Sequence, residues 1–227
     1  MEKVTDGLYQ VGKGYQAFII DGDEGVTLVD TGMPNKTEYI TDGLAAIGRR
    51  LQDVRHIVIT HAHIDHIGGL GVIASGSGAE TLCSLEDAPV VRGEAPMTPP
   101  PMMVRFPFLK IMLKLFPDAE PVEVDRLVAP GDTLTLSGDL TVLATPGHTV
   151  GHLSFLLDRS GGVMIVGDAA SASKKGKIVR GFFNAPTPEI DASIKAIATH
   201  DFAMAVFGHA APIRQGASAA FAEAAAK

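Results

Sequence analysis

Thr60-His61-Ala62-His63-Ile64-Asp65-His66-Ile67-Gly68-Gly69 is the stretch that decides the fold of this 227-residue chain. It places three histidines and an aspartate within six residues, directly after the apolar run Ile57-Val58-Ile59, which is typical of a buried strand. Imidazole nitrogens and carboxylates are good ligands for a borderline divalent metal such as zinc. A packed core or a solvated loop has little reason to hold four such side chains so close together. The stretch therefore predicts a metal site at the end of a strand.

The bulk composition limits the kinds of function. The chain is 46% hydrophobic and 20% charged, which is ordinary for a globular protein, and its net charge is −7. A general nucleic-acid binder is normally basic, so no nucleic-acid partner is expected. A metal site can nevertheless attract a small anion, because the ion reverses the local charge. The sequence has no apolar run long enough for a membrane span and no signal-like N-terminus, so we expect a cytoplasmic protein that acts on a small molecule.

Covalent nucleophiles have little support in the sequence. The single cysteine, Cys83, ends the short strand-like run Glu80-Thr81-Leu82-Cys83, so a buried and inert thiol is expected, and an internal disulfide is excluded. No Gly-x-Ser-x-Gly elbow occurs, which removes support for an activated serine. The chemistry is therefore expected to depend on the metal site.

The first half of the chain has a recognisable order of elements. Two short strand-like runs, 15–20 and 26–29, and the turn signal between them predict a hairpin that ends on Asp30. Apolar residues near helical spacing predict a helix over 35–50. A strand then leads to His61, and a further helix is predicted over 64–74. Asp30 and His61 thus both follow predicted strands.

The second half repeats this order. A hairpin over 155–166 is followed by Asp168, a helical segment near 188–199, and a strand over 204–207 that precedes His209. The repetition predicts two βα layers related by an internal pseudo-two-fold. Polar side chains would then meet at strand ends, which is where open α/β sheets bind their ligands.

A segment of about 92–121 separates the two halves and resembles an insertion. Its first part is rich in proline, which excludes a regular helix there, and the apolar run 108–116 follows. One interpretation is a helix packed on its own core. The alternatives are a lid over the active site, a wall of the substrate site, or a contact in a homodimer.

Five motifs in a fixed order show a resemblance to a known family over nearly the whole chain. They are Val29-Asp30-Thr31-Gly32, His61-x-His63-x-Asp65-His66, Pro146-Gly147-His148, Gly167-Asp168 and Gly208-His209. This pattern resembles the metallo-β-lactamase-fold superfamily of metallo-hydrolases. The resemblance implies an α/β fold in which residues 1–227 form a single domain, a four-layer αββα sandwich with the site at the sheet edges.

The resemblance also implies two divalent metal ions per chain. Zinc is favoured, and manganese, iron and cobalt are compatible with the same ligands. The first ion would be held by His61, His63 and His148, the second by Asp65, His66 and His209, and Asp168 would bridge them. Asp30 matches an aspartate that orients ligands without binding metal. The remaining histidines, His56, His152 and His200, are interpreted as structural or surface residues.

The function implied by the resemblance is dinuclear metal-dependent hydrolysis of a lactone or an ester. A hydroxide that bridges the two metals would attack the carbonyl carbon. Asp65 is the predicted catalytic residue, which would hold the nucleophile and carry a proton to the leaving group. An apolar substrate wall is predicted from Phe106, Phe108, Met112, Phe182 and Phe183.

Departures from subfamily patterns bear on the substrate. True β-lactamases of the family lack an aspartate in the role of Asp168, and glyoxalase II adds a C-terminal domain for which the 18 residues after His209 leave no room. Acyl-homoserine lactonases share the ligand set but use a tyrosine beyond the bridging aspartate, and here every tyrosine precedes Asp168. The alternatives are a phosphodiesterase or phosphotriesterase, a mononuclear iron persulfide dioxygenase, and a non-enzymatic metal-dependent binding protein.

Overall fold

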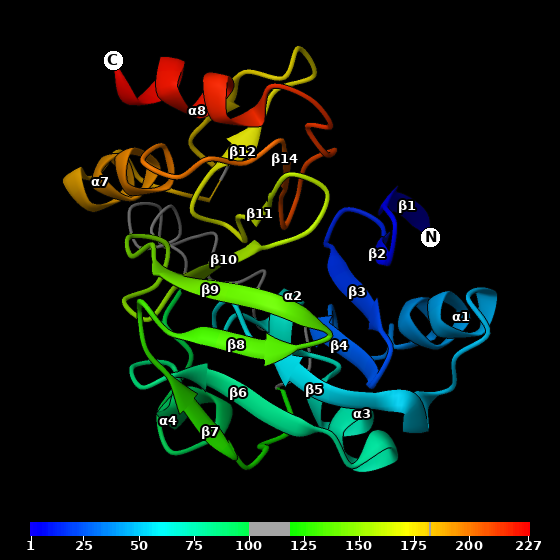
Figure 1. Ribbon diagram of the computed structural model, residues 1–227. Coiled ribbons are helices and arrows are strands. Elements are labelled where there is room, and N and C mark those ends of the chain that lie inside the picture. Colours follow the sequence, from blue (N-terminus) through cyan, green and yellow to red (C-terminus); the bar gives the residue numbers. More distant parts are fainter. Residues whose placement is uncertain (100–118, 182) are drawn as a thin grey trace. The chain divides into compact units, whose positions relative to one another are not determined.

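The computed structural model describes residues 1–99, 119–181 and 183–227 (Figure 1). These residues form two compact units. The first contains 1–97, 119–128 and 135–138, and the second contains 98–99, 129–134, 139–181 and 183–227. Most of the segment 92–121 lies outside the described residues, as do Phe106, Phe108, Met112 and Phe182. The predictions of a lid, a wall or a dimer contact there, and of a single domain over 1–227, stay predictions.

The first unit is built on a seven-stranded sheet whose strands follow one another in chain order. Neighbours are antiparallel from β1 to β4 and parallel from β4 to β7. The strands are β1 (Glu2–Thr5), β2 (Leu8–Val11), β3 (Ala17–Gly22), β4 (Gly25–Val29), β5 (Val54–Val58), β6 (Glu80–Ser84) and β7 (Arg126–Val128). The parallel arrangement puts the carboxyl ends of β4, β5 and β6 at one edge, because parallel strands all run the same way.

The helices of the first unit connect these strands. They are α1 (Glu38–Ala46), the 3₁₀ turn η1 (Leu51–Asp53), α2 (Ile64–Ile67), α3 (Leu70–Ser77) and α4 (Ala88–Val91). Helix α1 buries Ile40 and Leu44, which are four residues apart and therefore share a face that packs against β2 and β3 (Figure 1). It is shorter than the predicted 35–50, because Gly48 takes a left-handed conformation (φ 77°) that ends the helical path.

The helix predicted over 64–74 is two short helices, α2 and α3, separated by Gly68 and Gly69. A Cβ on Gly68 would lie 2.2 Å from Cδ of Pro34, and a Cβ on Gly69 would lie 2.6 Å from the carbonyl oxygen of Thr31. The loop after β4 thus crosses close over these two glycines. Glycine is needed there because a larger side chain would collide with this loop.

The second unit is built on a five-stranded sheet with the order β14-β11-β10-β9-β8. Strands β9, β10 and β11 are antiparallel neighbours, and β11 and β14 are parallel. The strands are β8 (Thr133–Leu136), β9 (Gly138–Ala144), β10 (Leu153–Leu157), β11 (Val163–Ile165) and β14 (Met204–Val206), with a separate pair β12 (Ser171–Ala172) and β13 (Ile178–Val179).

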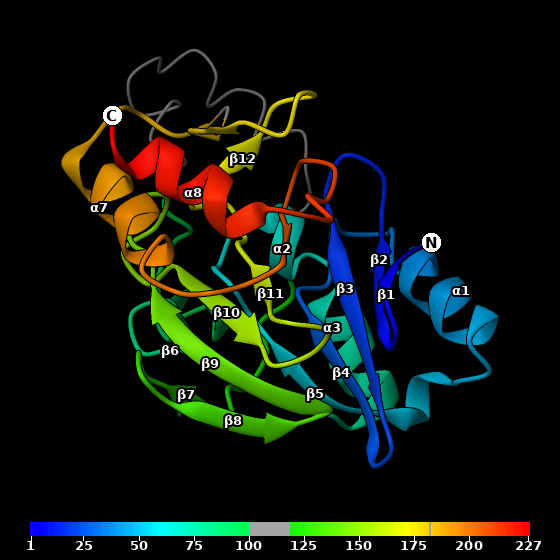
Figure 2. The same cartoon turned by 45° about the horizontal axis from the view of Figure 1, so that its top comes forward.

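Two helices of the second unit lie side by side in both ribbon views (Figures 1 and 2). They are α7 (Pro188–Ile197) and α8 (Ala217–Ala225). Helix α7 begins after Thr187, whose side chain accepts a hydrogen bond from the N–H of Ile190, with proline in the first turn. Phe221 of α8 stacks on Phe207, and both are fully buried in the core of this unit.

The predicted repetition of element order is confirmed within each unit. In the first, the antiparallel pair β3–β4 is followed by α1 and by β5, which is parallel to β4. In the second, the antiparallel pair β10–β11 is followed by α7 and by β14, which is parallel to β11. Asp30 and Asp168 therefore follow equivalent strands, β4 and β11. His61 and His209 follow the parallel strands β5 and β14.

None of the helices in the described ranges 1–99, 119–181 and 183–227 is both long and apolar enough to cross a membrane.

Candidate functional site

The first unit packs three imidazoles against one another at the end of β5. His61 and His66 are fully buried and His63 is 4% exposed. The ring centroid of His61 lies 4.7 Å from that of His63 and 4.0 Å from that of His66. Asp65, on α2, is only partly buried, and its Oδ2 lies 4.0 Å from Nε2 of His66. The unit thus brings together the four predicted ligands of the histidine stretch.

The carboxylate of Asp30 determines how His66 is oriented. Its Oδ2 lies 2.8 Å from Nδ1 of His66, and a carboxylate can only accept a hydrogen bond, so this nitrogen carries the proton of the neutral ring. Nε2 of His66 therefore keeps its lone pair on the side away from Asp30. Asp30 is itself held at φ 62°, and its carboxylate also accepts hydrogen bonds from the N–H and the hydroxyl of Thr60, both at 2.8 Å.

The same aspartate acts on His61 through Thr60. The hydroxyl proton of Thr60 is donated to Asp30, so the oxygen can only accept from Nδ1 of His61, 3.0 Å away. His61 is then also protonated on Nδ1, which leaves Nε2 with its lone pair. One buried carboxylate thus places the proton of two rings on Nδ1 and leaves the lone pair on Nε2. This is the contact expected of an orienting residue, and the role remains a prediction.

Asp87 was not identified from the sequence. Its Oδ2 accepts a hydrogen bond of 3.0 Å from the N–H of Ala62, the residue between His61 and His63. Its own N–H donates to the Ser84 side chain at the end of β6. Asp87 is 6% exposed, so this contact is shielded from water and fixes the backbone of the histidine stretch. No local pattern indicated it, because 25 residues separate the two partners.

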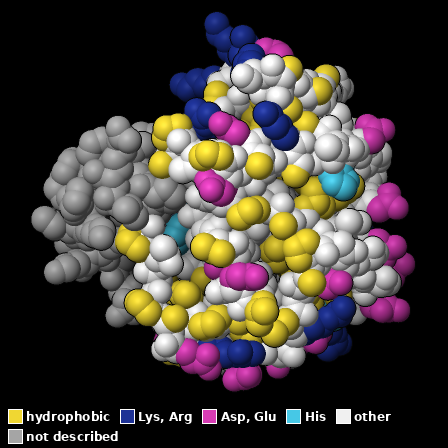
Figure 3. Space-filling model, turned by 90° about the vertical axis from the view of Figure 1, so that its left-hand side faces the viewer, with side chains coloured by type: hydrophobic (Ala, Val, Ile, Leu, Met, Phe, Trp, Pro, Cys, Tyr) yellow, Lys and Arg dark blue, Asp and Glu magenta, His cyan; other side chains and the backbone are white. Residues whose placement is uncertain are grey.

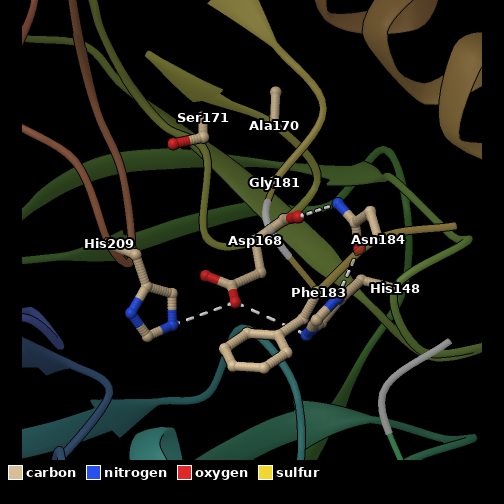
Figure 4. Close-up of a pocket in the computed structure, with 8 residues that line it drawn as sticks. All are labelled: His148, Asp168, Ala170, Ser171, Gly181, Phe183, Asn184 and His209. Carbon is tan, nitrogen blue, oxygen red and sulfur yellow. Dashed lines mark hydrogen bonds and ion pairs between the residues drawn. The ribbon is translucent and has the colours of Figure 1, made fainter. Parts of the chain in front are cut away.

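The second unit brings together the other three predicted ligands around one carboxylate. Oδ2 of Asp168 lies 3.4 Å from Nε2 of His148 and 3.1 Å from Nε2 of His209 (Figure 4). Strands β11 and β14 deliver Asp168 and His209, and the N–H of Gly208 donates to the carbonyl of Gly167, which ties the two loops together. His148 and Asp168 are buried, whereas the side chain of His209 is 28% exposed.

The glycine before His148 is required by packing. Gly147 has φ 123°, and a Cβ there would lie 2.8 Å from Cγ1 of Ile190 in the first turn of α7. The hydroxyl of Ser193 in the same helix donates to the carbonyl of Pro146 at 2.7 Å. The Pro-Gly-His motif therefore places its histidine by docking its first two residues on α7.

Asn184 holds His148 in one tautomer and was also missed from the sequence. Its Nδ2 donates to the backbone carbonyl of Asp168 at 2.8 Å, so its Oδ1 is the atom that faces Nδ1 of His148, 2.5 Å away. Oδ1 can only accept, which places the proton of the neutral ring on Nδ1. The lone pair of Nε2 then faces the carboxylate of Asp168. Two such electron-rich atoms attract only if a positive charge lies between them, which a metal ion or a second proton on the ring would supply.

A hollow of about 160 Å³ adjoins these ligands within the second unit. It is lined by His148, Asp168, Ala170, Ser171, Gly181, Phe183, Asn184 and His209 (Figure 4). Phe183 lines the same hollow as Asp168 and His148, and its role as a substrate wall stays a prediction (Figure 4). The lining thus combines the apolar groups of Ala170 and Phe183 with polar groups, which include the Ser171 hydroxyl and the proposed ligands.

Two residues outside the ligand set behave as the sequence indicated. Cys83 is fully buried in β6, and burial raises the pKa of its thiol to about 12, so it is no nucleophile at neutral pH. His56 is partly buried at the start of β5, and desolvation lowers its pKa, an effect that the nearby carboxylate of Glu80 partly offsets. Neither belongs to the ligand groups.

The described side chains on the face in Figure 3 mix acidic, basic and hydrophobic groups. They form no continuous basic surface on that face of the kind that binds nucleic acid.

Comparison with known sequences identifies the family. The sequence model of the metallo-beta-lactamase superfamily matches residues 12–209. The chain belongs to this superfamily. The predicted fold class is thereby confirmed, and a solved structure, a beta-lactamase from Chitinophaga pinensis, supports it. That structure matches with a TM-score of 0.73 at 20% identity and covers 99% of this chain and 89% of its own, which is a likeness of fold alone.

Curated relatives of this superfamily member include proteins named as hydrolases. It is 31% identical to the uncharacterized protein YobT of Bacillus subtilis, over 67% of this chain and 60% of the relative. A hydroxyacylglutathione hydrolase of Rhodobacter capsulatus is 29% identical over 61% of this chain and 42% of the relative. An N-acyl homoserine lactonase of Bacillus cereus is 26% identical over 67% and 62%. The chain thus spans about half the length of the relatives it matches.

The residues present suit the metals of this superfamily. Three buried imidazoles in the first unit and a carboxylate between two imidazoles in the second are the nitrogen and oxygen donors that divalent transition metals prefer. The tautomers of His61, His66 and His148 all leave Nε2 available as a ligand. The donor set therefore fits metal ions.

Proposed function

We propose that this chain is a metal-dependent hydrolase that cleaves a lactone or an ester. The observation that carries the proposal is the orientation of the imidazoles, because hydrogen bonds on Nδ1 leave Nε2 of His61, His66 and His148 as ligating atoms. In His66 and His148 that Nε2 atom also lies within 4.0 Å of the carboxylate of another proposed ligand, Asp65 or Asp168, which is the arrangement of donor atoms around a metal. Membership of the metallo-beta-lactamase superfamily and relatives named lactonase and hydroxyacylglutathione hydrolase support the same reaction class.

Seven side chains would hold two divalent ions, with zinc as the favoured metal. They are His61, His63, His148, Asp65, His66, His209 and, between the ions, Asp168. When bound, the ions would lower the pKa of a water molecule toward neutrality and polarise the substrate carbonyl.

Proton transfer in the proposed reaction is assigned to a side chain of the protein. Asp65 is the proposed proton carrier, because its side chain is 25% exposed while its neighbours His63 and His66 are buried. It would take a proton from the attacking water and deliver it to the leaving oxygen. Water oxygen bonds to the carbonyl carbon, the acyl–oxygen bond breaks, and an acid and an alcohol result. When the substrate is a lactone, the ring opens and the acid and the alcohol are two groups of the same hydroxy-acid product.

The hollow beside His148 and Asp168 supports a small carbonyl substrate. Its volume of about 160 Å³ is similar to that of an apolar protein cavity of about 150 Å³, which accommodates a benzene molecule. A lactone ring or a short acyl group fits this space, with Phe183 as an apolar wall and the Ser171 hydroxyl as a hydrogen-bonding group.

The test is hydrolysis by zinc-loaded protein across γ-lactones, aryl esters, thioesters, phosphodiesters, phosphotriesters and a β-lactam, with Asp168→Ala as the blank. Preference for lactones and esters that is lost in the variant supports the proposal. Preference for phosphoesters would keep the metal centre and overturn the substrate class, and preference for thioesters would favour the reaction of the hydroxyacylglutathione hydrolases. A protein that purifies with one iron per chain and oxidises a persulfide would overturn hydrolysis.

A further inference from the structure

The peptide backbone of Asp168 is held from both sides by buried side chains. Its N–H donates to Nε2 of His152 at 2.9 Å, and its C=O accepts from Nδ2 of Asn184 at 2.8 Å. His152 is 1% exposed and Asn184 is 5% exposed, so water does not compete with either contact. Gly167, which precedes Asp168, takes a left-handed φ of 58°, and glycine restricts the backbone least. The side chains of His152 and Asn184 therefore fix the backbone conformation at Asp168, which the flexible Gly167 leaves unrestrained.

His152 is fixed in one tautomer by a chain of hydrogen bonds whose direction can be derived. Nε2 accepts from the Asp168 N–H, so the proton of the neutral ring is on Nδ1, which donates to the Thr145 hydroxyl at 2.8 Å. That hydroxyl must then donate to Ser154, 2.9 Å away. Ser154 donates in turn to the backbone carbonyl of Val166 at 2.9 Å. The chain ends on a carbonyl that cannot donate, so it orients the ring and carries no proton onward.

Asn184 links Asp168 to a second predicted ligand. The amide that donates to the Asp168 carbonyl also accepts from Nδ1 of His148. One side chain thus aligns the backbone of one ligand and the ring of another. The result is that Oδ2 of Asp168 faces Nε2 of both His148 and His209.

We propose that His152 and Asn184 are positioning residues that hold the Asp168 peptide by its N–H and its C=O, and so aim the Asp168 carboxylate at the metals. This inference rests on the proposed metal centre. It revises the sequence-based interpretation of His152 as a merely structural or surface histidine. Groups that orient metal ligands typically change metal affinity by about 10- to 100-fold when they are removed.

A matched pair of substitutions at His152 separates positioning from packing. In His152→Gln the side-chain amide can reach the place of Nε2, and its oxygen can accept from the Asp168 N–H. In His152→Asn the amide reaches only the place of Nδ1, so it can still contact Thr145 but not Asp168. We expect His152→Asn to bind zinc about 10- to 100-fold more weakly in competition with a chromophoric chelator. His152→Gln should remain close to the wild type.

Asn184 offers a second pair in case His152→Asn does not fold. Asn184→Leu has a similar shape and loses both hydrogen bonds, whereas Asn184→Asp keeps an acceptor for His148 and loses the donor to Asp168. Both should weaken zinc binding, Asn184→Leu more than Asn184→Asp. Thermal unfolding of the metal-free variants measures any general loss of stability. If the two residues served only packing, the variants would lose stability, but the two members of each pair would not differ in zinc affinity.

A readout that needs no metal completes the test. Nitrogen-15 NMR of the histidine rings in metal-free protein should show His148 and His152 protonated on Nδ1. An Nε2-protonated His152 would overturn the inference, as would equal zinc affinities for His152→Asn and His152→Gln in a protein whose wild type binds zinc. A wild type that binds no zinc would instead overturn the proposed metal centre, together with the role in aiming Asp168 that depends on it.

Discussion

Asp30 and Asp168 follow equivalent strands of the two units, yet their surroundings differ. The carboxylate of Asp30 contacts Nδ1 of His66 and two groups of Thr60, so it is used for orientation. The carboxylate of Asp168 lies against Nε2 of His148 and of His209, while its orientation depends on side chains that hold its backbone. The carboxylate of Asp30 thus meets Nδ1 of one imidazole, whereas that of Asp168 meets Nε2 of two imidazoles.

The difference shows that the same repeated βα element gives its aspartate two different kinds of contact with imidazoles, which fit the two proposed roles. A carboxylate that contacts Nδ1 sets the tautomer and leaves Nε2 for a metal, whereas a carboxylate that contacts Nε2 is placed to be a ligand itself. The repeated unit supplies the position of the aspartate after the strand. The neighbouring loops decide which nitrogen it meets.

Substituting Asp168 should have the largest effect. Asp168→Asn removes the charge that two metals would share, so we expect one or both ions to be lost and hydrolysis to fall by about 10³-fold or more, since metals contribute several kcal/mol to such reactions. Metal content by mass spectrometry and turnover on the preferred lactone or ester measure the two effects. Full loading with two metals in Asp168→Asn would contradict the bridging role.

The same substitution at Asp30 should be milder. Asn is tolerated at the left-handed φ of 62°, and its oxygen can still accept from Thr60. Its NH₂ group would then replace Oδ2, which faces both Nδ1 of His66 and the Thr60 hydroxyl. This forces the proton of His66 onto Nε2, which disables that proposed ligand, and removes the acceptor of the Thr60 hydroxyl that orients His61. We expect metal affinity to fall by about 10- to 100-fold, measured by chelator competition. A loss as large as in Asp168→Asn would remove the distinction between the two aspartates.

Cys83 provides a control for the folding of the first unit. Because its thiol is buried and has a pKa of about 12, alkylation of the native protein at pH 8 should be slow and limited by unfolding. We expect the labelling rate in Asp30→Asn to stay close to that of the wild type. Rapid labelling of the variant would mean that Asp30 stabilises the whole unit and not only the orientation of His66.

The smallest expected effect concerns His56, which lies in the first unit outside the ligand group. Burial lowers its pKa in the folded state, so the unfolded chain takes up the proton first as the pH falls below about 6.5. The free energy of unfolding should therefore decrease as the pH falls through that value. The decrease between pH 7 and pH 5 should be smaller in His56→Gln than in the wild type. Denaturant midpoints at the two pH values measure this. An equal loss in both proteins would assign the acid sensitivity to other groups.

Parts of the site with a local signal could be predicted from the sequence. His61, His63, Asp65 and His66 stand together in the chain, directly after an apolar strand, and the order of hairpin, aspartate, helix, strand and histidine repeats. Both patterns follow from periodicity and residue chemistry over short distances. The break between α2 and α3 was missed, because Gly68 is required by the close approach of Pro34, and Pro34 belongs to a loop 34 residues earlier in the chain.

The sequence by itself determined the family, the two repeated βα elements and the identity of the candidate ligands, since strand ends and ligand types are encoded locally. Only the tertiary structure decided which nitrogen of each ring is protonated and which groups hold the ligand loops. Asp87 reaches Ala62 across 25 residues and Asn184 reaches His148 across 36. Hydrogen bonds between such distant positions have no periodic signal, because they exist only once folding has placed the two loops side by side.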